Sequence, residues 1–178
     1  MTISQKIAQL EKIEAMLKGG ASNLVAAFGS DLCASIAGRV INSGESSDGS
    51  SFSSYSTTPV PAFWYFGRSR NSAAEAKVKA AAKRKESISY RQFRGFNNLQ
   101  EAPKNFSFTN EMWRGFGVKK AEYVGGKYVL LIGGKTKESN ERIAWMSGQE
   151  GRSIIAPNDQ ELNRLAKAIT DKIVNDGR

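Results

Sequence analysis

Apolar residues recur at helical spacing near the start of the chain. In residues 2–18 they form one stripe and predict an amphipathic helix, which the pair Gly19-Gly20 ends. Residues 22–41 carry a second apolar stripe at every fourth position and predict another helix. The stripe residues are Ile3, Ile7, Leu10, Ile13 and Leu17 in the first helix and Leu24, Phe28, Leu32, Ile36 and Val40 in the second.

The hydrophobic period disappears in residues 42–62. Eight of the sixteen residues from Ser43 to Thr58 are serine, which predicts a long loop with a tight turn at Asp48-Gly49. Phe52 and Tyr55 are its only large apolar residues, and we expect them to pin the loop to another surface. A loop of this length in a compact domain is usually functional or disordered.

The next segment is basic and helical. Residues 73–85 combine alanine with lysine and predict a helix in which only Val78 and the alanines can pack. The stretch SISYRQFRGF follows and alternates aromatic residues with arginines. This part of the chain therefore predicts a solvent-facing or partner-binding surface.

From Asn105 onward the pattern is that of β-structure. FSFTN and MWRGFGV predict short strands, and AEYV-GG-KYVLLIG predicts a hairpin that turns at Gly125-Gly126. Residues 128–132 are apolar on both faces, which is typical of a central strand. Residues 138–146 then predict a short helix.

The last helix has the clearest start signal. Asn158 is its expected N-cap, and Glu161 three residues later completes a capping box. Gly177 is expected to end the helix. Its expected buried stripe is Leu162, Leu165, Ile169 and Ile173.

Helices followed by short strands and a terminal helix indicate an α+β fold. We expect N-terminal helices, an antiparallel sheet with a hairpin, a C-terminal helix packed on that sheet and a long Ser-rich loop. At 178 residues the chain has the length of one domain. Within it we distinguish N-terminal helices (1–41), an extended loop or arm (42–62), a basic helical segment (63–104) and the sheet with the last helix (105–178).

The composition argues against catalysis. The chain contains no histidine and a single cysteine, Cys33, so it lacks the general base of the usual serine and cysteine nucleophiles and the ligands of a structural zinc site. Its carboxylates are scattered singly, and no cofactor or metal is expected. Cys33 lies among apolar helical residues, which favours a buried hydrophobe. We expect a protein that is not an enzyme.

One segment resembles the end of a phosphate-binding loop. Gly134-Lys135-Thr136 follows an apolar strand, but that motif needs a glycine five residues before Gly134, and Val129 stands there. No long helix is expected directly after it either. We therefore interpret these glycines as the end of a strand.

The net charge of +9 is concentrated in one segment. Residues 68–94 carry nine basic and two acidic side chains, and such a block can face solvent, a polyanion such as DNA, or an acidic protein. No apolar stretch approaches 18 residues, and the N-terminus lacks the apolar centre of a signal peptide, so neither a membrane partner nor export is expected. The candidate contacts to a polyanion or acidic partner are Arg68, Arg70, Lys77, Lys83, Arg84, Lys85, Arg91 and Arg94.

The order of motifs resembles a family of tailed-bacteriophage proteins. After the helix of residues 22–41 come Asp48-Gly49, the pair Phe52 and Tyr55, and the basic stretch. FSFTNEMWRGFGV is then similar to the family element L-T-x-T/S-G-x-M-x-x-S-x-x-V, and RIAWMSGQEGRSIIAPNDQELNRL is similar to its segment before the final helix. The matching positions are Thr109, Met112 and Val118 in the first segment and Ala144, Gly151, Arg152, Ile154 and Ile155 in the second.

This resemblance is to the tail-completion and head–tail joining proteins of virion morphogenesis. It implies a structural virion protein that forms a homo-oligomeric ring, sixfold or twelvefold, in the phage neck. The partners would be the portal or connector ring and tail proteins, with genomic DNA in the lumen, and assembly would take place in the host cytoplasm. Tail completion, stopper and adaptor rings remain alternatives. Candidate subunit and ring contacts are Phe52, Tyr55, Trp64, Met112 and Trp113.

The rival interpretation is a basic nucleic-acid-binding protein. Its support is the alternation of aromatics and arginines in SYRQFRGF, which could stack on single-stranded bases. The glycine–aromatic sheet motif of common RNA-binding modules does not occur in the sequence.

Overall fold

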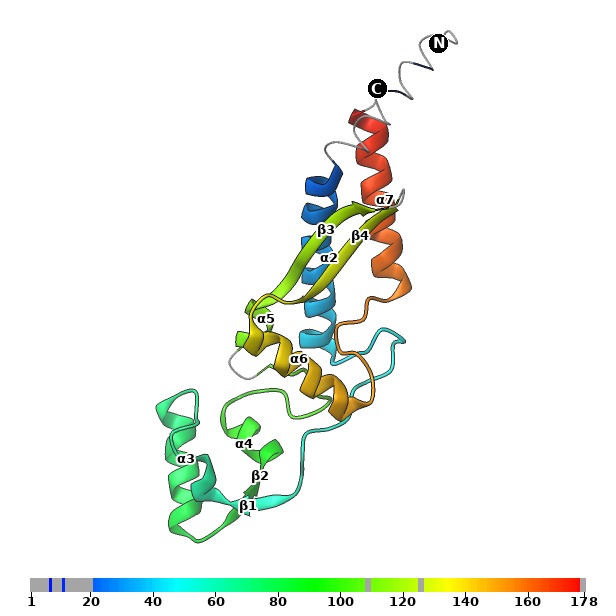
Figure 1. Ribbon diagram of the computed structural model, residues 1–178. Helices are drawn as coiled ribbons and strands as arrows, with labels where there is room; N and C mark the ends of the chain where they lie inside the picture. The colour runs from blue at the N-terminus through cyan, green and yellow to red at the C-terminus, as the bar shows by residue number, and fades with distance from the viewer. Residues whose placement is uncertain (1–6, 8–10, 12–20, 108–109, 125–126, 177–178) are drawn as a thin grey trace. The chain divides into compact units, whose positions relative to one another are not determined.

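The computed structural model describes residues 7, 11, 21–107, 110–124 and 127–176 and confirms an α+β protein (Figure 1). The helix expected in residues 2–18 lies outside this part of the chain except for Ile7 and Glu11. The chain divides into two compact units. We call residues 1–38 with 111–178 the first unit and residues 39–110 the second unit, whereas the sequence pattern placed its divisions at 41/42 and 104/105.

The first unit contains a long helix, a hairpin and two further helices. Helix α2 begins it and continues into the second unit. The two hairpin strands of the first unit pair antiparallel from Phe116↔Gly134 to Val124↔Lys127, with a register shift between Val118 and Lys120. The expected turn at Gly125-Gly126 lies outside the described residues. The elements are α2 (Ala21–Ser43), α5 (Glu111–Arg114), β3 (Phe116–Val124), β4 (Lys127–Gly134), α6 (Lys137–Glu150) and α7 (Asp159–Asp176).

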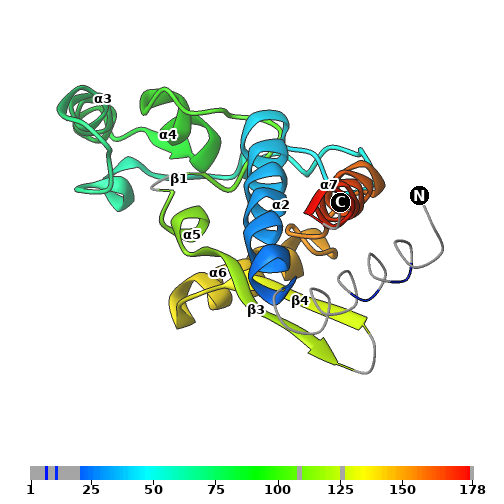
Figure 2. The same cartoon turned by 90° about the horizontal axis from the view of Figure 1, so that it is seen from above.

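The hairpin packs on α2 at a glycine. A Cβ on Gly29 would lie 2.7 Å from the side chain of Leu130 and 2.9 Å from that of Val118, so the missing side chain permits this close approach (Figure 2). On the other face, Val129 and Leu131 are 46% and 51% exposed. The expectation of a central strand was wrong, because β3 is the only strand that pairs with β4 among the described residues.

Helix starts were better predicted than buried stripes. The Asn158 side chain accepts a hydrogen bond from the Glu161 amide, and the Glu161 carboxylate accepts one from the Asn158 amide, which confirms the capping box. Glu161 is buried by this role, while Leu162 of the expected stripe is 43% exposed. The expected strand MWRGFGV is also partly wrong, since its first residues form α5.

The second unit has its own small aromatic core. β1 and β2 pair antiparallel, with Val60 opposite Ile88. The first strand lies in residues 42–62, which the sequence predicts as loop, and the second lies in the basic helical segment 63–104, so neither strand was predicted. Tyr65 stacks on Phe93 with ring centroids 4.4 Å apart, and Val78 of the basic helix is fully buried beneath them. The elements are β1 (Pro59–Pro61), η1 (Ala62–Tyr65), α3 (Ser72–Lys83), β2 (Ser87–Ser89) and α4 (Tyr90–Phe96).

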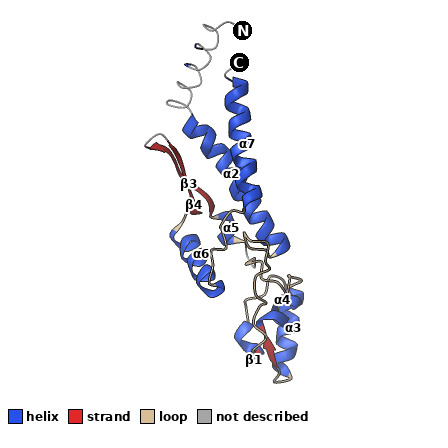
Figure 3. Ribbon diagram, turned by 90° about the vertical axis from the view of Figure 1, so that its right-hand side faces the viewer, coloured by secondary structure: helices blue, strands red, loops and turns tan. Residues whose placement is uncertain are grey.

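Helix α2 is long and apolar. The segment Asn23–Ser43 is long and apolar enough to cross a membrane, which corrects the expectation that no apolar stretch approaches that length. A buried core helix passes the same test. In the first unit, α2 buries Val25, Leu32 and Ile36 and runs beside α7 (Figure 3).

Candidate functional site

The two aromatics of the Ser-rich loop are buried inside the second unit. Phe52 packs edge-on against Phe106 with ring centroids 5.0 Å apart, and only 3% of it is exposed. The Tyr55 hydroxyl accepts hydrogen bonds from the Asn105 and Phe106 amides and donates one to the Asn105 side chain. The loop is thus pinned as expected, but to its own unit. This corrects its interpretation as an arm whose aromatics anchor a neighbouring subunit.

Arg94 also has a structural place. Its guanidinium donates to the Gln100 carbonyl at 2.7 Å, the Ser107 carbonyl at 2.9 Å and the Asn105 side chain at 3.0 Å. It lies 3.9 Å from the centre of the Tyr55 ring, and 1% of the residue is exposed. A polyanion cannot reach this charge, so Arg94 is removed from the candidate contacts.

The three other aromatic and methionine candidates fall into two classes. Met112 and Trp113 are buried in the first unit, where Trp113 packs edge-on against Phe116. They therefore hold the start of the hairpin in place and offer a neighbour little surface. Trp64 is different, because 58% of it is exposed.

Six of the eight basic candidates remain on the surface. The Arg84 guanidinium forms a bidentate ion pair with the Glu86 carboxylate, with N–O distances of 2.7 and 3.0 Å. This hydrogen bonding lowers the pKa of Glu86. Arg91 is half-buried and lies 3.4 Å from the Glu101 carboxylate. The exposed residues are Arg68, Arg70, Lys77, Lys83, Arg84 and Lys85.

The segment Gly134-Lys135-Thr136 caps a helix. Contrary to expectation, a helix of 14 residues follows this segment directly. The backbone amides that would bind a phosphate, however, already donate hydrogen bonds within the protein. The Gly134 amide donates to the Asn140 side chain, and Thr136 and Ser139 form a reciprocal capping box. The amides therefore serve the turn itself, which agrees with the interpretation of Gly134 as the end of a strand.

Cys33 is a buried thiol with a raised pKa. It is 4% exposed, and burial raises its pKa from 9.0 to about 11, an effect that the nearby Lys135 charge partly offsets. The neutral thiol is the nucleophilically inert form. Cys33 therefore belongs to the core.

We expect Cys33 to resist alkylation in the folded protein. At pH 8 the thiolate fraction falls about 100-fold when the pKa rises by two units, and burial slows the reaction further. Because the pKa of Cys33 is higher in the folded protein than in the unfolded one, burial of the neutral thiol stabilises the fold fully below pH 9. This stabilisation is lost as the pH rises toward 11. Maleimide labelling of native and guanidinium-unfolded protein measures this. Equal labelling rates in the two states would contradict the assignment.

The surface feature that sequence reasoning missed is a short aromatic turn. Phe63, Trp64 and Phe66, which we call the aromatic turn, are 57%, 58% and 47% exposed, while Tyr65 between them is buried. The sequence signal was the run AFWYF after Pro61, in which four large aromatics cannot all face one small core. Isolated exposed apolar residues are ordinary, but three within four positions of the chain make this turn a candidate interaction surface.

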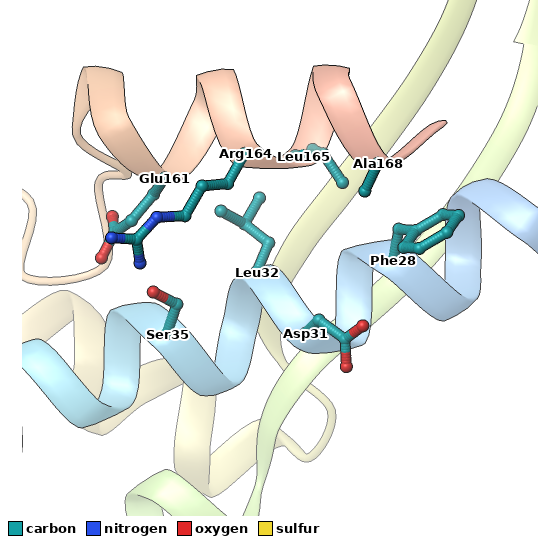
Figure 4. A pocket seen from close by; sticks show the side chains of 8 residues that line it. All are labelled: Phe28, Asp31, Leu32, Ser35, Glu161, Arg164, Leu165 and Ala168. Atoms are coloured by element: carbon teal, nitrogen blue, oxygen red, sulfur yellow. The ribbon is translucent and has the colours of Figure 1, made fainter. Parts of the chain in front are cut away.

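The first unit holds an open apolar pocket between α2 and α7, the α2–α7 pocket. Its volume is about 230 Å³. Figure 4 shows Leu32, Leu165 and Ala168 lining its middle, with Phe28 at one end and the long Arg164 side chain toward the other. Asp31, Ser35 and Glu161 complete the lining.

Among the described residues no three His, Cys, Asp or Glu side chains converge in a way that could hold a metal ion. The features that stand out are the aromatic turn, the exposed hairpin face and the pocket. Comparisons with protein-family models, curated proteins and solved structures found no match to this chain.

Proposed function

We propose that the protein is a structural virion protein of a tailed-phage neck, which forms a homo-oligomeric ring between the DNA-filled head and the tail. One observation carries the assembly part of this proposal: each unit exposes large apolar side chains. They are Phe63, Trp64 and Phe66 in the second unit and Val124, Val129 and Leu131 on the hairpin. Surfaces of this kind mark protein–protein contacts.

The order of motifs supports the neck. The first family-like segment includes α5 and the start of β3, where Met112 is buried. The second runs from α6 through the left-handed Gly151, which ends that helix, to the buried Ile154 before α7. The two segments, residues 106–118 and 142–165, therefore precede and follow the hairpin along the chain, and the first begins in the second unit and continues into the first.

A nucleic-acid-binding role has weaker support. The stretch SYRQFRGF no longer offers a stacking surface, because Phe93 and Arg94 are buried. The exposed basic side chains around α3 keep a polyanion as a candidate neighbour of the ring. Binding of this kind would weaken steeply as salt concentration rises.

The neck proposal is tested by an early stop codon in this reading frame of the phage genome. We expect electron micrographs of the lysate to show DNA-filled heads lying apart from finished tails. Supplying the protein from a plasmid should restore joined particles. Normal joined particles without the protein would remove the neck assignment and favour the nucleic-acid role.

A further inference from the structure

The aromatic turn presents its side chains from a held backbone. The Ala62 amide donates to the Glu86 carbonyl, and the Phe66 and Arg68 amides donate to the carbonyls of Phe63 and Tyr65. These bonds fix the turn on both sides. A preorganised projection loses little conformational entropy when it is bound.

The backbone after the turn is fixed by α3. Gly67 has φ 69°, a conformation that favours glycine, and its amide donates to the Glu75 carboxylate at 3.1 Å. This hydrogen bond is also the main reason that the pKa of Glu75 is lowered. The turn is therefore anchored to the helix beside it, and its exposed rings are a stable feature of the surface.

The α2–α7 pocket has the size and character to receive one of these rings. A closed apolar cavity of about 150 Å³ is large enough for benzene. The pocket, at about 230 Å³, has room for the larger indole of a tryptophan. Its middle is formed by Leu32, Leu165 and Ala168, so an indole would replace water against apolar walls (Figure 4).

The charges around the two features are complementary. Arg68 and Arg70 follow the aromatic turn closely and are exposed, and residues 39–110 carry eleven basic and five acidic side chains. The charged side chains that line the pocket are those of Asp31, Glu161 and Arg164, two acidic and one basic, and the Asp31 carboxylate is exposed. A guanidinium such as that of Arg164 can stack on an aromatic face, which would favour a ring in this pocket.

We propose that Trp64 of one copy inserts into the α2–α7 pocket of the next copy. This inference rests on the proposed ring and names one of its contacts. A closed ring needs a heterologous interface, in which two different surfaces of neighbouring copies meet. The chain carries a projecting aromatic and an open apolar pocket in different units, so every copy supplies one of each. A buried tryptophan in a pocket is the usual energetic centre of such an interface.

Two single substitutions separate the halves of this interface. Trp64→Ala removes the projecting ring and leaves the pocket intact, while Ala168→Trp fills the pocket and leaves Trp64 intact. We expect each purified variant to lose the ring and run as a monomer in size-exclusion chromatography with light scattering. Mixed in equal amounts, they should form a heterodimer and nothing larger, because one intact contact remains between them.

Matched controls show whether a change of residue type alone has these effects. Trp145→Ala removes a tryptophan that is 64% exposed on α6, and Ala166→Trp adds one at an exposed position of α7. Both should keep the wild-type mass. Circular dichroism of all four variants should match the wild-type spectrum, since the altered side chains lie at the surface or in an open pocket.

Three outcomes would overturn the inference. They are a wild-type protein that is monomeric, a Trp64→Ala or Ala168→Trp variant that keeps the wild-type mass, and a mixture that yields no heterodimer. None of these decides the neck proposal, which depends on the particles made by the stop-codon phage. Detached heads and tails together with an intact Trp64→Ala ring would keep the neck function and assign the contact elsewhere.

Discussion

Arg94→Met is expected to lower the free energy of unfolding of the second unit by about 3–5 kcal/mol. Methionine keeps the apolar stem but removes every donor of the guanidinium. The carbonyls of Gln100 and Ser107 and the side-chain oxygen of Asn105 would then lose these charge-assisted hydrogen bonds in the interior. Each such loss costs about 1–3 kcal/mol, and the contact with the Tyr55 ring is lost as well.

Hydrogen exchange read by mass spectrometry is the suitable measurement, since it reports each unit separately. Amides of residues 90–107 should exchange about 100- to 5,000-fold faster in the variant, as a loss of this size implies. Arg91→Ala is the matched control on the same helix, because its ion pair with Glu101 is half-exposed and worth less than about 1 kcal/mol. Equal exchange in Arg94→Met and Arg91→Ala would show that the buried hydrogen bonds add nothing.

The sequence predicted three of the longer helices well because their signals are local. The apolar spacing of residues 22–41, the capping residues Asn158 and Glu161, and the alanine-rich stretch of residues 73–85 each act within a few turns of one helix. The structure places α2, α7 and α3 there. The α+β class follows from these elements together with the hairpin.

What the sequence did not predict depends on contacts between distant residues. Tyr55 meets the amides of Asn105 and Phe106, fifty residues on, and no local pattern distinguishes this partner from a neighbouring subunit. Arg94 looked like a surface charge because charged residues are rarely buried. Its donors are matched by acceptors that only the folded loop brings together.

The candidate contacts show the same limit. The sequence alone places Phe52, Tyr55, Trp64 and Trp113 together as candidate interface contacts, but Phe52 and Trp113 are buried in the cores of their own units, while Trp64 is exposed. Propensity alone cannot rank them, because burial and binding both favour large rings. The local clue was the run of four aromatic residues at positions 63–66, because one short turn can direct only some of its rings toward the core.

Gly134→Ala is expected to destabilise the first unit by about 3 kcal/mol, because the end of β4 touches the first turn of α6. A Cβ on Gly134 would overlap the backbone nitrogen of Asn140 and lie 2.6 Å from the Ser139 carbonyl carbon. These are backbone atoms of a capped helix, so they cannot move aside as a flexible side chain would. The Gly134 amide also donates to the Asn140 side chain, a bond that any shift would weaken.

Gly148→Ala in α6 is expected to have the opposite effect and to stabilise the first unit. Apart from its chain neighbours and the backbone of its own helix, no atom of the described residues lies within 4 Å of the position that its Cβ would take, and alanine is favoured over glycine in a helix by about 0.5–1 kcal/mol. Urea unfolding of both variants, followed by hydrogen exchange in residues 116–150, measures the pair. A stable Gly134→Ala protein would mean that β4 and α6 can separate. Loss of stability in both variants would mean instead that α6 tolerates no added side chain, whatever space surrounds it.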